Sequence, residues 1–268
     1  MTNKYDLTAE AVVAYEAQKV VSIFKPLAEA TMDKVNVDSD ASVIDIACGT
    51  GIIGRTIRHR YGQGPALTCV DLSSAMISTA KSLSEPLGGR FSWIVGDAME
   101  IPVADRAHTM CFCQQGIQYM PDDAAAIGEM ARVLAVGGQL VITVWAPANA
   151  YFQAQAAAMG RHVGKEWAAK AVAPFAYRGD ERLPQLMANF GLDNISVEQI
   201  SIDRIIRDAE TGVAEDIEGS PLLPAFCDAP PETRAAIVEN ILSDCVEFKQ
   251  GNDLIIPQHC HLITGRRM

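Results

Sequence analysis

Hydrophobic and polar positions along the chain follow two alternating patterns. Short, mostly apolar runs rich in β-branched residues alternate with stretches whose apolar positions recur at helical spacing. The apolar runs predict strands at residues 41–47, 66–71, 91–96, 109–114, 139–145, 196–206 and 254–266. The helical spacing predicts helices at 9–32 (interrupted at Pro26), 51–60, 73–85, 122–136 (closed by Gly137 and Gly138), within 147–179, at 181–190, and two within 209–250.

Strands that are apolar on both faces and are separated by helices are typical of a parallel sheet covered on both sides. Right-handed crossovers then make such a sheet doubly wound. The sequence therefore predicts an α/β fold, with helices around a seven-stranded, mostly parallel sheet. Ligands of these sheets bind outside the carboxyl ends of the strands, so chemistry is expected at that edge.

The length of 268 residues fits one large domain with insertions. Residues 1–146 are expected to form a ligand-binding core that begins with the N-terminal helices. Two stretches lack strand patterns and are predicted to be helical cap insertions for the substrate, at 147–179 and 207–252. The whole chain, 1–268, is interpreted as a single domain.

A glycine-rich turn follows the first predicted strand, in Val43-Ile-Asp-Ile-Ala-Cys-Gly-Thr-Gly51. Gly49 and Gly51 let the backbone approach a ligand closely, because they lack a Cβ. The amides that follow open a helix, whose positive end attracts a carboxylate. Asp45 could accept hydrogen bonds from an ammonium group. This combination suits a ligand that carries both an amine and a carboxylate, as an amino acid does.

A dinucleotide site is the main alternative for the same turn. Gly49, Gly51 and Gly54 satisfy the spacing GxGxxG, and Asp71 follows about 20 residues later as a ribose acceptor. An NAD-dependent oxidoreductase is therefore an alternative function. Asp45 argues against it, because a carboxylate at the loop would repel a pyrophosphate. A glycine turn without any ligand is the third interpretation.

Two further acidic residues end predicted strands. Asp71 ends the second strand and could accept from both hydroxyls of a ribose, or instead cap the helix that begins at residue 73. Asp97 ends the third strand, where the exocyclic amine of an adenine would need an acceptor. Ala98 could add a backbone amide to the same ring. A turn-forming aspartate is the alternative for Asp97.

These segments, in this order, resemble class I S-adenosylmethionine (SAM)-dependent methyltransferases, and specifically the type 11 group of ubiquinone/menaquinone C-methyltransferases and their small-molecule relatives. The resemblance is dense over about residues 9–146. It is carried by Val-Ile-Asp-Ile-Ala-Cys-Gly-Thr-Gly at 43–51, Cys-Val-Asp-Leu-Ser at 69–73, Val-Gly-Asp-Ala at 95–98, Cys-Gln-Gln-Gly-Ile-Gln-Tyr-Met-Pro-Asp at 113–122 and Arg-Val-Leu-Ala-Val-Gly-Gly-Gln-Leu at 132–140. It implies a Rossmann-like fold, SAM as cofactor and S-adenosylhomocysteine (SAH) as its product.

The resemblance also implies roles for individual residues at the cofactor site. The methionine moiety would be lined by Asp45, Ala47, Gly49 and Gly51, the ribose by Asp71 and Leu72, and the adenine by Asp97 and Ala98. Gln114 and Gln115 would reach the methionine part or the substrate, and Tyr15 would cover the cofactor or simply pack in the core. His108 departs from the family pattern, which usually has Asp there, and is expected to be a surface histidine away from the site.

The expected reaction is methyl transfer to an O, C or N atom of a small, apolar or aromatic acceptor. Tyr119 and His259 are candidate bases, with His162 and His261 as further options, although a single histidine is more often structural. Candidate substrate contacts are Gln118, Trp145, Phe152 and Phe175, whose alternative role is to pack the insertions together. A protein that uses SAM structurally, or for a non-methylating reaction, is a further alternative.

Composition narrows the partners. The net charge of −11 disfavours nucleic acid, whose binding depends on Lys and Arg contacts. The seven cysteines form no CxxC pair, so neither a metal site nor a disulfide framework is expected. No apolar run approaches the roughly 20 residues of a membrane span. The start, Met1–Asp6, lacks a signal-peptide pattern, so a cytoplasmic protein is expected. The sequence does not define the oligomeric state, and a homodimer is one alternative.

Overall fold

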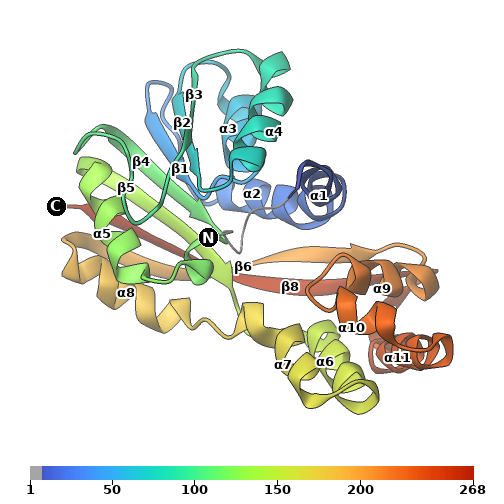
Figure 1. Cartoon of the computed structure of the whole chain (residues 1–268). Helices are drawn as coiled ribbons and strands as arrows, with labels where there is room; N and C mark the ends of the chain where they lie inside the picture. Colours follow the sequence, from blue (N-terminus) through green and yellow to red (C-terminus); the bar gives the residue numbers. More distant parts are fainter. Residues whose placement is uncertain (1–7) are drawn as a thin grey trace. The chain divides into compact units, whose positions relative to one another are not determined.

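Two units, each built from separate segments of the sequence, make up the chain in a computed structural model that describes residues 8–268. The first, called the core unit, comprises residues 8–144, 179–200 and 260–268; the second, called the helical unit, comprises residues 145–178 and 201–259. Residues 1–7, which include the segment inspected for a signal peptide, lie outside the described part. Figure 1 shows both units coloured along the sequence.

The central sheet has the strand order β3-β2-β1-β4-β5-β8-β6, with a short β7 paired to β8. Its strands are β1 Ser42–Ile46, β2 Ala66–Asp71, β3 Phe91–Val95, β4 His108–Gln114, β5 Leu134–Trp145, β6 Leu192–Ile206, β7 Lys249–Gln250 and β8 Asp253–Arg267. The pairs β1–β2, β1–β4, β2–β3 and β4–β5 are parallel, and β7–β8 is antiparallel. The predicted doubly wound, mostly parallel sheet is confirmed, and the two-residue β7 is an addition to the seven expected strands.

The helices that connect the strands of the core unit pack against the sheet (Figure 1). α4 packs on β2 and β3, α5 packs on β4, and α2 packs on α3. The helices are α1 Ala9–Tyr15, η1 Glu16–Phe24, α2 Lys25–Met32, α3 Ile52–Tyr61, α4 Ser74–Ser84, η2 Glu85–Leu87, η3 Ile117–Tyr119, α5 Asp123–Val133 and α8 Gly179–Asn189. Ser73 and Asp122 cap α4 and α5, because their side chains accept from the amides of Met76 and Ala125.

Burial agrees with the interior position of β1 in the sheet, between β2 and β4. Val43, Ile44 and Ile46 are fully buried, as expected for a strand whose two faces are both covered by helices. Their neighbour Asp45 is only 2% exposed. A carboxylate at such a position is costly to bury, so its presence indicates a function that an apolar residue could not supply.

The boundary between α5 and β5 differs from the prediction. The sequence pattern predicts a helix to residue 136, but the helix ends at Val133 and β5 begins at Leu134. Leu134 pairs with His108 at the start of β4, and the register then shifts so that Gln139 pairs with Met110. Gly137, with a φ of 80°, supplies the left-handed conformation that this irregularity needs.

Two helical stretches are also more finely divided than predicted. The N-terminal stretch contains a π-helical segment, Glu16–Phe24, which continues directly into α2, and Pro26 lies in the first turn of α2. Three helices, not two, fill the stretch 209–250: α9 Ala209–Glu218, α10 Leu223–Asp228 and α11 Pro231–Asp244. The short α10 forms because its Phe226 is buried in an apolar core.

The helical unit has its own hydrophobic core. Its elements are α6 Ala150–His162, α7 Lys165–Val172, η4 Ala173–Phe175, α9, α10, α11 and η5 Val246–Phe248. Buried side chains from α6, α9, α10 and α11 meet in this core, among them Tyr151, Met159, Val213, Phe226 and Ile241. α6 packs against both α7 and α11.

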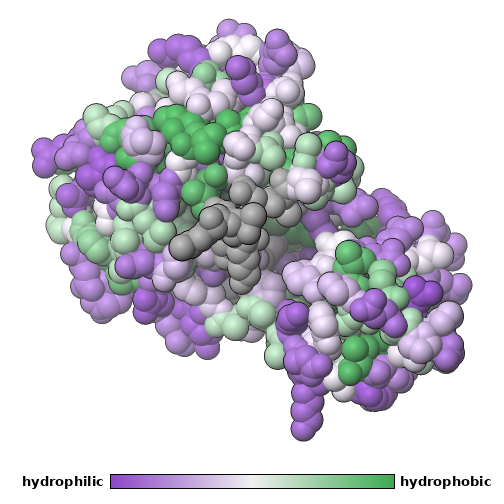
Figure 2. Space-filling model, in the orientation of Figure 1, coloured by the Kyte–Doolittle hydropathy of each residue, from purple (hydrophilic) through white to green (hydrophobic). Residues whose placement is uncertain are grey.

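Polar residues predominate on the face of the molecule drawn in Figure 2, where they are purple, and apolar residues in green gather in separate patches. Every helix within residues 8–268 lacks either the length or the apolar character that crossing a membrane requires.

Candidate cofactor site

The glycine loop joins β1 to α3 in the core unit. Three of its residues have left-handed backbone conformations, with φ values of 55° at Ala47, 55° at Gly49 and 79° at Gly51. Ala47 is not a glycine, so this conformation stores strain, which is common where a loop is shaped for a ligand. A Cβ added at Gly51 would lie 3.1 Å from the Trp93 ring, so a larger residue would push the loop off the sheet.

Asp71 holds this loop from the end of β2. The Gly49 amide donates to Asp71 Oδ2 at 2.8 Å, and the Ser73 amide donates to Oδ1 at 2.9 Å. Burial raises the pKa of Asp71, and these two amide bonds partly offset that rise. Each carboxylate oxygen keeps a further lone pair, so the group can also accept from ribose hydroxyls. The cap of α4 is Ser73, not Asp71.

Asp45 lies beneath the loop without a hydrogen-bond partner. Neither oxygen of its carboxylate has one among residues 8–268, although the side chain is buried. Burial, followed by the nearby charge of Asp71, raises the pKa of Asp45 well above its usual range. A buried, unpaired carboxylate is costly, and an ammonium group from a ligand would satisfy it. The residues present therefore fit the amino-acid end of SAM.

The loop itself contains one polar residue that sequence reasoning missed. Thr50 is 1% exposed, and its Oγ1 has no hydrogen-bond partner within the described part of the chain. The only signal for it was its position between Gly49 and Gly51. Its hydroxyl adds a donor and an acceptor to the glycine loop.

Asp97 begins the loop that follows β3. Its Oδ1 accepts from the Met99 amide at 2.8 Å, and its carbonyl accepts from the Glu100 amide at 3.1 Å. Asp97 therefore does form a turn, as its alternative interpretation stated. The adjacent Gly96 donates its amide to the Asp71 carbonyl at 3.0 Å, which keeps the ends of β2 and β3 together. Ala98 is half-buried next to them, and Leu72 is 43% exposed after β2.

The end of β4 carries three glutamines with unsatisfied groups. The Gln114 amide group donates to the Phe24 carbonyl at 3.1 Å, and the Gln118 amide group donates to Gln115 Oε1 at 3.0 Å. One buried atom of each remains without a partner among residues 8–268: Gln114 Oε1, Gln115 Nε2 and Gln118 Oε1. These atoms can donate to or accept from a neutral polar ligand.

Gln115 also has a strained backbone, with a φ of 56°. Its amide donates to the Thr143 carbonyl at 2.9 Å, which fixes the end of β4 on β5. A Cβ added at the following residue, Gly116, would lie 2.6 Å from Ala47 Cβ. The loop after β4 therefore packs tightly against the glycine loop, and the strained Ala47 and Gln115 belong to neighbouring turns.

Tyr15 comes to the glycine loop from the N-terminal helices. Its ring centroid lies 5.5 Å from that of Phe24, and a Cβ added at Gly49 would lie 4.0 Å from its hydroxyl. Burial and the charge of Asp71 raise the pKa of Tyr15. Arg55 of α3 donates to Glu16 at 2.7 Å, and this ion pair ties the π-helical segment to the first helix after the loop. Tyr15 thus stands over the loop, as a cofactor-covering residue would.

Several predicted site residues lie in the helical unit and are described apart from this loop. Trp145 and Phe175 have ring centroids 6.1 Å apart, and those of Phe152 and Phe175 are 4.3 Å apart, so these aromatic residues pack together. His259 Nδ1 lies 2.6 Å from Ser201 Oγ. The other candidate base, Tyr119, is in the core unit and is 44% exposed.

The prediction of a surface histidine at position 108 is wrong. His108 is 6% exposed, and its Nδ1 lies 3.0 Å from Ser42 Oγ. β4 begins at this residue and is already covered there, because His108 pairs with Leu134 of β5. Burial lowers the pKa of His108.

Metal-binding clusters are absent from residues 8–268, where no group of three or more His, Cys, Asp or Glu side chains is arranged to hold an ion. Six cysteines are buried free thiols, and Cys227 is an exposed one.

Residues 43–138 match the family model described as a methyltransferase domain. Demethylmenaquinone methyltransferase of Bacillus licheniformis is 32% identical over 111 residues, which are 41% of this chain and 47% of that relative. The ubiquinone/menaquinone biosynthesis C-methyltransferase of Roseobacter denitrificans is 29% identical over 144 residues, which are 53% of this chain and 54% of that relative. Residues 43–138 of this chain are therefore similar to a methyltransferase domain.

A solved structure extends the similarity beyond the matched domain. Phosphoethanolamine N-methyltransferase 2 of Haemonchus contortus, in complex with phosphomonomethylethanolamine and SAH, gives a TM-score of 0.62 at 16% identity, over 97% of this chain and 57% of that one. At this identity the likeness shows the fold alone. The chain spans about half the length of the curated relatives described above. The comparisons therefore support a methyltransferase domain at residues 43–138.

Proposed function

We propose that this protein transfers the methyl group of SAM to a small-molecule acceptor. The observation that carries this proposal is Asp45, a buried carboxylate without a partner in the described chain, directly beneath a glycine loop. A SAM ammonium group would supply the charge-assisted hydrogen bonds that this carboxylate lacks. The methyltransferase domain at residues 43–138 supports the same proposal.

The remaining contacts follow the order of the strands. The amides that open α3 after Gly51 would receive the methionine carboxylate, because a helix amino end favours negative charge. Asp71 and Leu72 would hold the ribose. Asp97 and Ala98 would hold the adenine, with the free lone pairs of the Asp97 carboxylate as acceptors. Tyr15 would cover the amino-acid end above Gly49.

The chain's own contribution to the reaction is chiefly alignment. When bound, SAM supplies a methyl group that its sulfonium already activates, so holding the acceptor in line with it accounts for much of the rate. Gln115 and Gln118 would orient the acceptor through their unsatisfied amide atoms. Tyr119 or His259 would take a proton from an acceptor that must lose one.

We propose a neutral, apolar or aromatic acceptor. The unsatisfied groups at the end of β4 are all carboxamides, which suit carbonyl or hydroxyl groups better than charges. The relatives named for menaquinone and ubiquinone biosynthesis support this class. Residues 147–179 and 207–252 would serve as substrate insertions, with Trp145, Phe152 and Phe175 as apolar contacts. A cytoplasmic location and a homodimer stay predictions from the sequence.

The alternatives differ in measurable ways. An NAD-dependent oxidoreductase would place a pyrophosphate at the glycine loop, where the buried carboxylate of Asp45 would repel it. A protein that binds SAM without methylating would never form SAH. Incubation with SAM and a panel of quinols, phenols and small amines, with mass spectrometry of both SAH and product, tests the proposal. Stoichiometric SAH and a product heavier by one methylene support it; SAM recovered intact from every incubation contradicts it.

A further inference from the structure

Side chains of α5 form hydrogen bonds with the loop that follows β3. Ile101 is 3% exposed, and both of its backbone polar groups are bound by one ion pair. The Ile101 amide donates to Glu129 Oε2 at 2.8 Å, and the Ile101 carbonyl accepts from Arg132 Nη2 at 2.8 Å. The two side chains also bind each other, with Arg132 Nε donating to Glu129 Oε1 at 2.6 Å and Nη2 to Oε2 at 2.7 Å. This bidentate pair fixes the direction of the backbone at Ile101.

Arg132 also forms hydrogen bonds with residues further along the loop. Its Nη1 donates to the Val103 carbonyl at 2.9 Å and to Asp105 Oδ1 at 2.7 Å. The Arg132 carbonyl accepts from the Arg106 amide at 2.9 Å. One arginine therefore binds the loop at four successive points, between residues 101 and 106. A lysine at this position could not reach two carbonyls and two carboxylates at once, because it lacks the planar fork.

The segment that Arg132 binds, residues 101–106, is close in sequence to Asp97. The bonds from the Met99 and Glu100 amides close a tight turn over Asp97, and Glu100 is followed at once by Ile101. Pro102 folds back onto the start of the loop, since a Cβ added at Gly96 would lie 3.0 Å from Pro102 Cδ. The backbone between Gly96 and Val103 is therefore fixed at one end by the sheet and at the other by α5.

We propose that Arg132 and Glu129 are positioning residues for the nucleobase: from α5, they hold Asp97 and Ala98 where these two residues recognise the adenine ring. The pair acts through the loop and has no contact with the cofactor in this assignment. The proposal rests on the proposed function, because it needs SAM as the ligand. The pKa of Glu129 is lowered by Arg132, which agrees with a permanent ion pair at neutral pH.

The test compares two ligands that differ only in the base. SAH carries the exocyclic amine, which would donate a hydrogen bond to the Asp97 carboxylate. S-inosylhomocysteine carries a carbonyl in place of that amine. Calorimetric titration of the wild-type protein should show SAH bound at least about 10-fold more tightly, the worth of one hydrogen bond to a charged group. Arg132→Lys and Glu129→Gln should each weaken SAH binding by about 10-fold and leave S-inosylhomocysteine binding nearly unchanged, so that the preference falls toward one.

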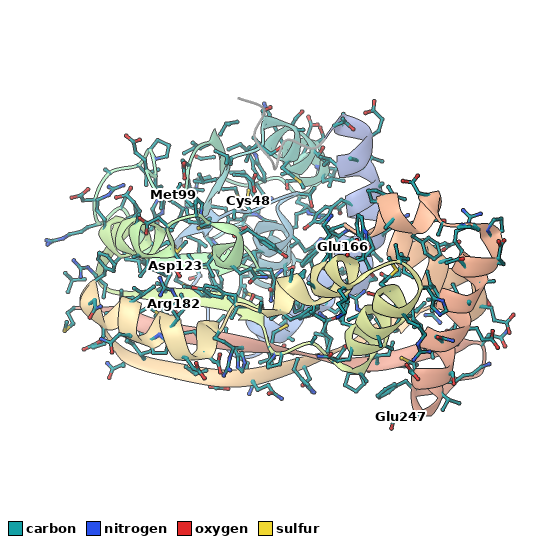
Figure 3. All side chains as sticks on the ribbon, turned by 60° about the horizontal axis from the view of Figure 1, so that its bottom comes forward. Cys48, Met99, Asp123, Glu166, Arg182 and Glu247 are labelled. Carbon is teal, nitrogen blue, oxygen red and sulfur yellow. The ribbon has the colours of Figure 1, made fainter. Side chains whose placement is uncertain are left out.

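Arg182→Lys is the matched control. Arg182 of α8 donates to Asp123 Oδ1 at 2.7 Å, so it also binds a carboxylate of α5 (Figure 3). This variant should keep the full preference for SAH. A purely structural role for Arg132 would weaken both ligands equally and lower the melting temperature, without a change in the preference. That result would overturn the proposal.

A measurement on the unaltered protein covers the case in which the variants fail to fold. Hydrogen exchange at the Met99 and Ile101 amides should slow when SAH binds and slow less when S-inosylhomocysteine binds. Equal exchange with both ligands would contradict the proposal. Absence of any SAH binding by the wild-type protein would instead contradict the proposed function itself, so the two failures are distinguishable.

Discussion

Replacing Asp45 with asparagine should make the ligand-free protein more stable and the cofactor complex weaker. The Asp45 carboxylate is buried without a partner among residues 8–268, and burial together with Asp71 raises its pKa. Asparagine has nearly the same shape and carries no charge. The substitution therefore removes an unfavourable buried charge and leaves only a neutral amide oxygen to accept from the ammonium group of SAM.

The size of both effects follows from the charge that is removed. Asparagine leaves the same buried polar groups without partners, so only the cost of the charge changes. Each tenfold rise in the proton affinity of the Asp45 carboxylate is worth about 1.4 kcal/mol, so Asp45→Asn should raise the free energy of unfolding by at least about that amount. For a chain of this size, each kcal/mol corresponds to about 2–4 °C in melting temperature. Loss of a hydrogen bond to a charged group costs about 1.5–3 kcal/mol, which predicts SAM binding about 10- to 100-fold weaker.

The stability gain should depend on pH with a definite sign. A carboxyl whose folded pKa is raised contributes stability at low pH and loses it as the pH rises through that folded value. The wild-type protein should therefore match Asp45→Asn at acidic pH and fall behind it as the pH rises, until the difference reaches a plateau.

Thermal unfolding of both proteins between pH 4 and pH 9, together with SAM titration at pH 8, measures these effects. Asp40→Asn, at an exposed position, is the control and should change neither quantity. An Asp45→Asn protein that is less stable than wild type at pH 8, or that binds SAM equally well, would refute the reasoning.

Three more predictions concern the same loop. Asp71→Ala should weaken SAH binding by about 10- to 100-fold, because it removes the ribose acceptor and frees the Gly49 amide; equal affinity in a titration would remove Asp71 from the site. Gly49→Val should abolish SAM binding, because a β-branched residue at a φ of 55° is strained and blocks backbone approach; a folded variant that still binds would show that no ligand approaches there. SAM affinity should fall as the pH is lowered through the raised pKa of Asp45, with proton release on binding; titrations in two buffers of different ionisation enthalpy would reveal a lack of proton release.

The sequence predicted the structure best where the residues of one feature follow one another along the chain. The strand, glycine loop and helix at residues 42–61 come from one uninterrupted pattern, and the structure has them in the predicted order. The carboxyl-end rule then placed Asp45, Asp71 and Asp97 at one edge, since each of them lies at or near the end of a predicted parallel strand. The position of a polar residue at the end of a strand can therefore be predicted from the local sequence.

What sequence reasoning missed depends on contacts between distant segments. The hydrogen bond from Gly49 to Asp71 joins residues that are 22 positions apart in the sequence, and the bond from Arg132 to Ile101 joins residues that are 31 positions apart. Nothing local to Arg132 distinguishes it from a solvent-facing helix residue. His108 is buried because β5 begins early and covers the start of β4, which the helical pattern up to residue 136 concealed. Such partners follow from packing, which overrides local preference.

Calorimetric titration of the protein with SAM, SAH and NAD in parallel tests the central claim most directly. The account predicts micromolar binding of SAM and SAH, proton release on SAM binding, and no binding of NAD. Binding of NAD without SAM or SAH would contradict it, because the unpaired carboxylate of Asp45 would then lie beneath a pyrophosphate and not beside an ammonium group.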